Sequence, residues 1–190
     1  MWMGLPQIVM MPVAAVLAKR FDNRVVCTAG LLLFAASCFM NSRMDANTGH
    51  DQLIMSQVLR ALGQPLIVLT LSNFAIHRVE LPNLSSASSL YNMSRILGGA
   101  VGTAILATTI TLREHLHSAR IGESVSLFAD ATNERLDQLG SEFVLRSGDV
   151  SDAHQQAIAV LDHLVRRESY VMAYNDCFFI LGCVLLVSIV

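Results

Sequence analysis

The stretch YNMSRILGGAVGTAIL, residues 91–106, decides how the whole chain is interpreted. It places Arg95 beside an uncharged run that contains the glycines Gly98, Gly99 and Gly102. In a soluble helix both choices are unfavourable, because Gly costs about 1 kcal/mol relative to Ala and an unpaired Arg is almost never buried. In a bilayer, small residues let helices pack closely and an embedded Arg faces protein or water. The stretch therefore predicts a membrane helix.

The charge of the chain is distributed as in a membrane protein. Of the 190 residues, 53% are hydrophobic and 15% are charged, and the mean hydropathy is +0.51, whereas soluble domains have about 25% charged residues. Residues 1–18, 25–42 and 96–112 carry no charge, 52–77 carry only Arg60, and 170–190 carry only Asp176. Such runs match the roughly 20 apolar residues that cross the hydrocarbon. The net charge of −2 and the lack of a basic stripe give no indication of a nucleic-acid partner.

We predict an all-α membrane protein with about five transmembrane helices, at about 1–18, 25–42, 53–76, 90–112 and 170–190. The chain then divides into four transmembrane helices within 1–112, an external loop over 113–168, and the last transmembrane helix within 169–190.

Basic residues in the short loops predict the orientation of these helices, because such residues are retained in the cytoplasm. Lys19, Arg20 and Arg24 lie in the first loop, and Arg43 is the basic residue of the second. The first loop is therefore expected in the cytoplasm and the second outside. The N-terminus and the long loop 113–168 then lie outside, and the C-terminus lies inside.

The external loop is too long for a bare connection between two helices. Within it, SDAHQQAIAVLDHLVRR places apolar residues on one helical stripe behind Ser151, a candidate N-cap. The stripe residues are Ala157, Ile158, Leu161, Leu164 and Val165. One or two amphipathic helices are therefore expected on the membrane surface or on the mouth of the bundle. His115 and His117 point to different helix faces, so neither a metal nor another cofactor is predicted.

Three ionisable residues inside the predicted spans are candidates for a substrate or coupling pathway. Arg60 lies two turns inside the third span, where an isolated Arg costs about 3 kcal/mol. Arg95 lies near the cytoplasmic end of the fourth span, and Asp176 lies near the outer end of the last. The alternatives are snorkelling or a hydrogen bond to helix-end carbonyls for the arginines, and for the carboxylate a role in capping a kink or a position in the outer water. No pattern of catalytic residues indicates an enzyme.

Several motifs occur in an order that points to a family. Arg60 precedes a span with Gly and Pro, an LP turn follows, and then comes the block Y-N-x-x-R-x-L-G-G-x-x-G-T-A, which contains Asn92, Arg95 and the glycines. The segment ends in R-E-x-L-H, and AYNDCFF opens the last span. Residues 60–126 thereby resemble the C-terminal half of the fourteen-span drug:proton antiporters of the major facilitator superfamily, of the EmrB/QacA type, and with the start of the last span the resemblance covers nearly the whole chain.

The resemblance implies a partial major facilitator bundle in the inner membrane of a bacterium, which exports small amphipathic toxic compounds in exchange for protons. It adds Asn92 to the pathway candidates and assigns the missing N-terminal half of the transporter as a partner, beside the lipid bilayer. It also suggests a periplasmic adaptor for the external loop. The chain by itself is expected not to transport. Two alternatives stay open: a membrane assembly or regulatory protein that does not transport, and a major facilitator transporter for a metabolite or siderophore.

Overall fold

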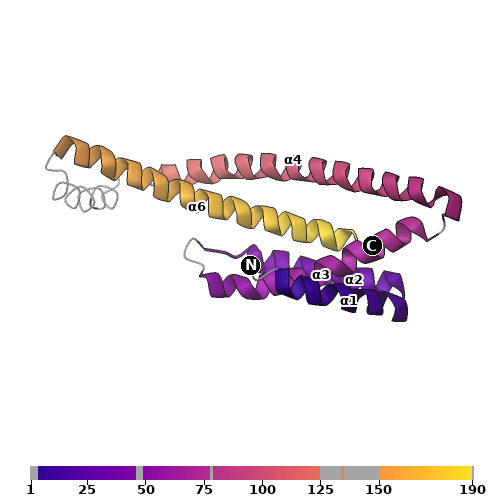
Figure 1. Ribbon diagram of the computed structural model, residues 1–190. Coiled ribbons are helices and arrows are strands. Elements are labelled where there is room, and N and C mark those ends of the chain that lie inside the picture. Colours follow the sequence, from indigo (N-terminus) through magenta and orange to yellow (C-terminus); the bar gives the residue numbers. More distant parts are fainter. Residues whose placement is uncertain (1–3, 46–48, 78, 125–133, 135–149, 190) are drawn as a thin grey trace. The chain divides into compact units, whose positions relative to one another are not determined.

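A computed structural model describes the whole chain except residues 1–3, 46–48, 78, 125–133, 135–149 and 190 (Figure 1). The described residues are mostly helical and contain no strand, so the predicted all-α fold class is confirmed. They form two compact units, one of Met1–Ala107 with Asn175–Val190 and one of Thr108–Tyr174.

Five α-helices account for most of the described residues. They are α1 (Gly4–Arg20), α2 (Asn23–Asn41), α3 (His50–Ile76), α4 (Leu84–Ser124) and α6 (Val150–Val187), and a 3-10 turn, η1 (Leu81–Asn83), precedes α4. Helices α1, α2 and α3 lie side by side within the first unit (Figure 1). Helices α4 and α6 each contribute residues to both units.

Four of these helices are long and apolar enough to cross a membrane. The candidate spans are Asn23–Asn41, Leu53–Ile76, Leu84–Glu123 and Gln155–Val187. The described part of α1 has 17 residues, which gives a length of about 25 Å against a hydrocarbon core of about 30 Å. The fifth predicted span, at the N-terminus, therefore stays a prediction.

The outer surfaces of the first unit are apolar. Ile8, Ile96 and Val187 expose 71%, 67% and 74% of their surface. Large apolar side chains exposed to this extent are unfavourable in water, whereas lipid tails solvate them as well as they solvate one another. The exposure therefore agrees with the membrane environment that the sequence predicts.

Helices α4 and α6 are much longer than a membrane span. They contain 41 and 38 residues, which gives each a length of about 60 Å, twice the thickness of the hydrocarbon core. Both helices therefore continue from the predicted spans into the segment 113–168. The described ends of that segment are extensions of the two helices.

The helix predicted behind Ser151 is confirmed, but it is the first half of α6 and is continuous with the last predicted span. Ser151 lies inside this helix, which begins at Val150, and so is not its N-cap. The predicted apolar stripe is only partly correct. Ala157 is fully buried and Leu161 and Val165 are half-buried, whereas Ile158 and Leu164 are both 42% exposed.

Helices α2 and α3 approach each other at two glycines. A Cβ atom added to Gly63 would lie 2.8 Å from the carbonyl oxygen of Gly30 and 3.1 Å from the backbone nitrogen of Phe34. A Cβ added to Gly30 would lie 2.9 Å from the Cβ of Leu66. Real Cβ atoms essentially never come closer than 3.0 Å to such neighbours. Glycine at both positions therefore allows the close backbone contact that stabilises helix pairs in membranes.

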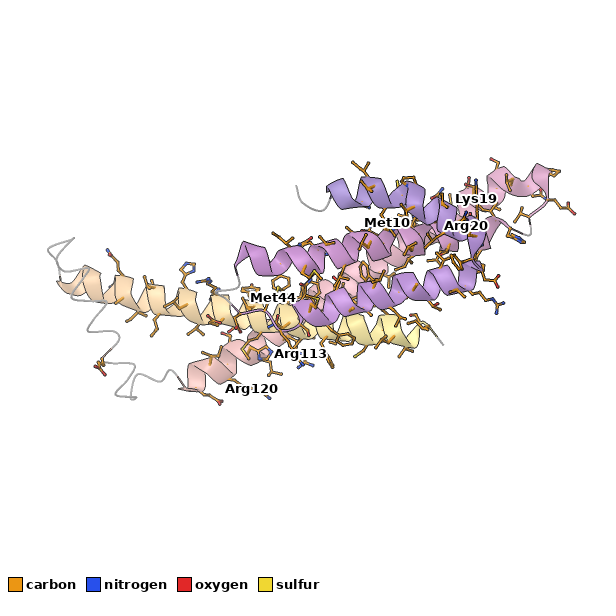
Figure 2. The ribbon with its side chains drawn as sticks, turned by 90° about the horizontal axis from the view of Figure 1, so that it is seen from below. Met10, Lys19, Arg20, Met44, Arg113 and Arg120 are labelled. Atoms are coloured by element: carbon orange, nitrogen blue, oxygen red, sulfur yellow. The ribbon has the colours of Figure 1, made fainter. Side chains whose placement is uncertain are left out.

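Helix α1 packs against this pair through a small apolar cluster. Ala14 of α1, Val26 of α2 and Leu66 of α3 are each at most 3% exposed. Met10 and Leu17, about one turn before and one turn after Ala14 on α1, pack against them, and Met10 is labelled in Figure 2. This cluster attaches α1 to the α2–α3 pair.

The last part of α6 is attached to the chain just after α2. The side-chain amide of Asn175 donates to the carbonyl oxygen of Met44 at 2.6 Å, and its Oδ1 accepts the backbone N–H of Met44 at 3.2 Å. The rings of Phe39 and Phe179 stack edge to face at 5.7 Å, and the Phe39 ring lies against Gly182. The second loop and the start of the last span thus meet, which agrees with the predicted placement of both on the outer side.

Asn175→Ala is expected to destabilise the first unit by about 1–3 kcal/mol, because it leaves two backbone groups of Met44 without partners. The same substitution at Asn92 is the control, since Asn92 is exposed and the described structure gives it no hydrogen bond; its effect should stay within about 0.5 kcal/mol. Thermal unfolding in detergent measures both changes, and hydrogen exchange at the Met44 amide should quicken in N175A alone. Equal effects at the two positions would contradict the assignment.

Candidate functional site

The site is built where α2 and α3 run antiparallel through the predicted membrane. The glycine contact fixes which residues of α2 and α3 face each other. Further facing pairs follow from it toward the predicted outer ends of the two helices. The facing pairs are Gly30 with Gly63, Phe34 with Arg60, and Ser37 with Ser56. The hydroxyl of Ser37 donates to the carbonyl oxygen of Ser56 at 3.0 Å, and both serines are buried. Close approach at the glycines thus brings an arginine, an aromatic ring and two hydroxyls together between two membrane helices.

Arg60 lies over an aromatic ring. Its Cζ atom is 5.7 Å from the centre of the Phe34 ring, within the range of a cation–π contact. Arg60 lies seven residues after Leu53, where the candidate span begins, which places it about 10 Å along that span. The residue as a whole is half-buried by protein.

Two polar atoms of this region are buried without partners. They are Nε of Arg60 and Oε1 of Gln57, and neither makes a hydrogen bond among the described residues. The two residues are three apart on α3 and therefore lie on the same face. Leaving a buried polar atom unsatisfied costs about 1–3 kcal/mol. An N–H donor and an amide oxygen acceptor without partners thus lie on one face of α3, at a cost in stability.

This cluster of Phe34, Gln57 and Arg60 can bind a polar group that enters the membrane interior. The guanidinium offers several N–H donors and a fixed positive charge, and the Gln57 amide offers both a donor and an acceptor. The Phe34 ring adds a flat apolar surface on which an aromatic or aliphatic group can rest. The combination suits an amphipathic molecule better than a simple ion.

The other predicted residues of α4 are not part of this cluster. Asn92 and Arg95 are exposed, and the described residues give neither a hydrogen bond nor an ion pair. A Cβ atom added to Gly98, Gly99 or Gly102 would meet no described atom within 4 Å. The packing role of these glycines therefore stays a prediction.

Asp176 and the basic residues of the first loop have different surroundings. Asp176 is half-buried and interacts with a neighbour, so it is not a free carboxylate. Lys19 and Arg20 lie exposed at the end of α1 (Figure 2), and Arg24 lies exposed in the first turn of α2. Among the residues that the structure describes, no group of three or more His, Cys, Asp or Glu side chains is placed to hold a metal ion.

The structure adds residues that the sequence prediction missed. Gly30, Phe34 and Gln57 lie at the site together with Arg60, and Asn175 bonds to Met44 just after α2. Gln57 could have been predicted from the sequence, because it is a polar residue one turn before Arg60 in an apolar run. Phe34 and Gly30 could not, because they come from another span.

The fold and site define a multi-pass α-helical membrane protein with a polar cluster inside a span. No protein-family model matches the chain, and no solved structure matches it. It is 25% identical over 185 residues to the colistin resistance protein EmrB of Acinetobacter baumannii and 27% identical over 194 residues to the multidrug export protein EmrB of Escherichia coli. It is 21% identical over 187 residues to the fatty acid resistance protein FarB of Neisseria gonorrhoeae.

These alignments cover 97%, 97% and 98% of this chain and 36%, 35% and 35% of the relatives. The chain thus spans about a third of the length of the curated relatives it matches, and it aligns with their C-terminal part. The predicted resemblance of nearly the whole chain to the C-terminal part of EmrB-type exporters is confirmed.

Proposed function

We propose that this chain forms the C-terminal part of a secondary transporter, which exports small toxic compounds across the inner membrane of a bacterium in exchange for protons. The observation that carries the proposal is the alignment of 97% of the chain with a relative named a multidrug export protein. The cluster of Phe34, Gln57 and Arg60 supports it, because a transporter needs polar groups at membrane depth that are free to receive a substrate.

The proposed pathway also includes Asn92, Arg95 and Asp176. Asn92 and Arg95 lie one turn apart on a face of α4 that no described residue covers. We propose that the rest of the transporter covers this face and packs on Gly98, Gly99 and Gly102. A substrate site between two halves cannot form from one, so the chain alone binds lipid but does not transport.

The chain reconstituted alone in proteoliposomes is expected to show no drug-dependent proton flux above that of empty vesicles. A chimera in which it replaces the aligned C-terminal 35% of the E. coli relative is expected to restore flux, because both halves of the site are then present. Flux is measured with a pH-sensitive dye, and the amount of each protein in the membrane is measured by immunoblot. Flux by the chain alone would contradict its proposed inactivity. A chimera present at the level of the relative, yet without flux or resistance, would contradict the transport function.

A further inference from the structure

The α2–α3 pair is built differently on the two sides of the contact between Gly30 and Gly63. Toward the predicted inner side, Val26 and Leu66 are at most 3% exposed and pack together with Ala14 of α1. Toward the predicted outer side, the residues between the two helices are mostly polar. We call them the polar seam, which consists of Ser37 and Asn41 of α2 and Ser56, Gln57 and Arg60 of α3. Apolar packing therefore holds one half of the pair, and polar groups at membrane depth lie along the other.

The polar seam is closed, and most of its polar groups lack partners. Ser37 and Ser56 are fully buried and share a single hydrogen bond of 3.0 Å. Oε1 of Gln57 and Nε of Arg60 are buried without a hydrogen-bond partner among the described residues. Each such atom costs about 1–3 kcal/mol, and neither can be reached from outside the protein while the helices stay together. Separation of the outer halves would remove this cost, because water would reach both atoms.

Helix α3 is weakened next to the glycine contact. Pro65 lies inside α3 and has no N–H group, so the carbonyl oxygen of Ala61 loses its helical donor. Gly30 and Gly63 bring the two backbones together without interlocking side chains. Proline is a common cause of helix bending. The outer half of α3 can therefore bend away from α2 while the apolar cluster holds the inner halves together.

We propose that the outer halves of α2 and α3 separate about the Gly30–Gly63 contact and admit water and small anions to the polar seam from the outer side. In the open state, the guanidinium of Arg60 attracts the anion, and its Nε atom and Oε1 of Gln57 both gain hydrogen-bond partners. The proposal does not depend on transport, because all of these residues belong to the first unit.

Cys38 reports on this opening. It is 3% exposed, it follows Ser37 on α2, and it lies close enough to Arg60 for the charge of the guanidinium to act on its thiol. Thiol reagents attack the thiolate, which forms only where water has access, so the Cys38 thiol reacts only when the polar seam opens. Cys27 is the matched control, because it lies on the same helix on the inner side of Gly30 and is half-buried.

The test uses the 190-residue chain in bacterial spheroplasts, whose outer membrane face is accessible. Two single-thiol variants are made by replacing the other cysteines with Ala, so that one keeps Cys38 and the other keeps Cys27. Each is treated with membrane-impermeant methanethiosulfonate reagents, one anionic and one cationic, and labelling rates are measured by mass spectrometry. Each rate is divided by the rate of the same reagent with a free thiol in solution.

Cys38 is expected to be labelled from the outside, about tenfold faster by the anionic reagent than by the cationic one, because the charge of Arg60 attracts the anion. Arg60→Met should bring this ratio to about one. Cys27 should stay unlabelled from the outside. Pro65→Ala restores a backbone donor to α3 and should slow the labelling of Cys38 about threefold to tenfold, whereas Pro12→Ala, which changes the proline inside α1, should not.

Three outcomes would overturn the proposal. If Cys38 is labelled only after denaturation, the seam stays closed, and if it is labelled only in inverted membrane vesicles, the seam opens to the other side. If the two reagents label Cys38 at equal normalised rates while Arg60 is present, the path does not pass the guanidinium. The ratio between reagents is measured within each variant, so a change in the amount of folded protein does not affect it.

Discussion

Gly63→Ala is expected to destabilise the α2–α3 pair by about 1–3 kcal/mol, and Gly63→Leu by about 3 kcal/mol or more. The added Cβ would lie 2.8 Å from the Gly30 carbonyl oxygen and 3.1 Å from the Phe34 nitrogen. Both neighbours are backbone atoms, so no side-chain rotation relieves the clash and the two helices must move apart. Thermal unfolding in detergent measures the loss, and faster labelling of the buried Cys38 thiol would locate it in this pair.

The control is the same pair of substitutions at Gly98, which also lies inside a predicted span. A Cβ there meets no described atom within 4 Å, so G98A should be neutral or slightly stabilising, because Ala favours the helix by about 1 kcal/mol. If G98A costs as much stability as G63A, glycine content rather than the α2–α3 contact sets the stability. If both are neutral, the two helices do not meet at Gly63.

The comparison of these glycines shows what could be predicted from the sequence. Gly98 and Gly102 form a local pattern four residues apart that is visible within a single span. Gly30 and Gly63 are single glycines in different spans, and only the antiparallel register of α2 and α3 makes them face each other. Sequence shows where a residue is small, but it does not show which backbone lies opposite.

The class of fold was predictable because a long uncharged run indicates that a helix is surrounded by lipid and not by water. The ends of α4 and α6 were not predictable in the same way. A fall in hydropathy marks the edge of the hydrocarbon. A helix can continue past this edge into water, because its backbone hydrogen bonds can continue there. The segment 113–168 was therefore interpreted as a loop with separate helices, although its described ends continue α4 and α6.

The candidate site was predictable only in part, and for a related reason. Arg60 is conspicuous because it is the one charge in its span, but its neighbour Phe34 comes from another helix. Near the outer end, Asp176 was singled out for its charge and Asn175 was passed over. The structure gives Asn175 a defined role, because its hydrogen bonds reach Met44, 131 residues away in sequence. Single residues that carry charge are visible in sequence, and contacts between distant segments are not.

Arg60→Met is expected to separate stability from transport. Methionine has a similar length and can lie on Phe34, but it has no donor that needs a partner, so the isolated chain should be as stable as before or more stable. In the chimera with the E. coli relative, drug transport should fall by about tenfold or more, because the charged hydrogen-bond donor at the site is lost. Thermal unfolding measures the first effect and the initial rate of drug export measures the second.

Two further variants show which property of Arg60 is responsible for the expected loss of transport. Arg60→Lys keeps the charge but loses the planar group that lies on the Phe34 ring, so its transport should fall between those of the unmodified chimera and R60M. Arg43→Met is the matched control, because Arg43 is exposed after the end of α2, and it should change neither stability nor transport. If R60M lowers the stability of the isolated chain and leaves transport unchanged, Arg60 is a structural residue. In that case its unpartnered Nε does not mark a substrate pathway, because an atom held for a substrate contributes to transport and not to folding.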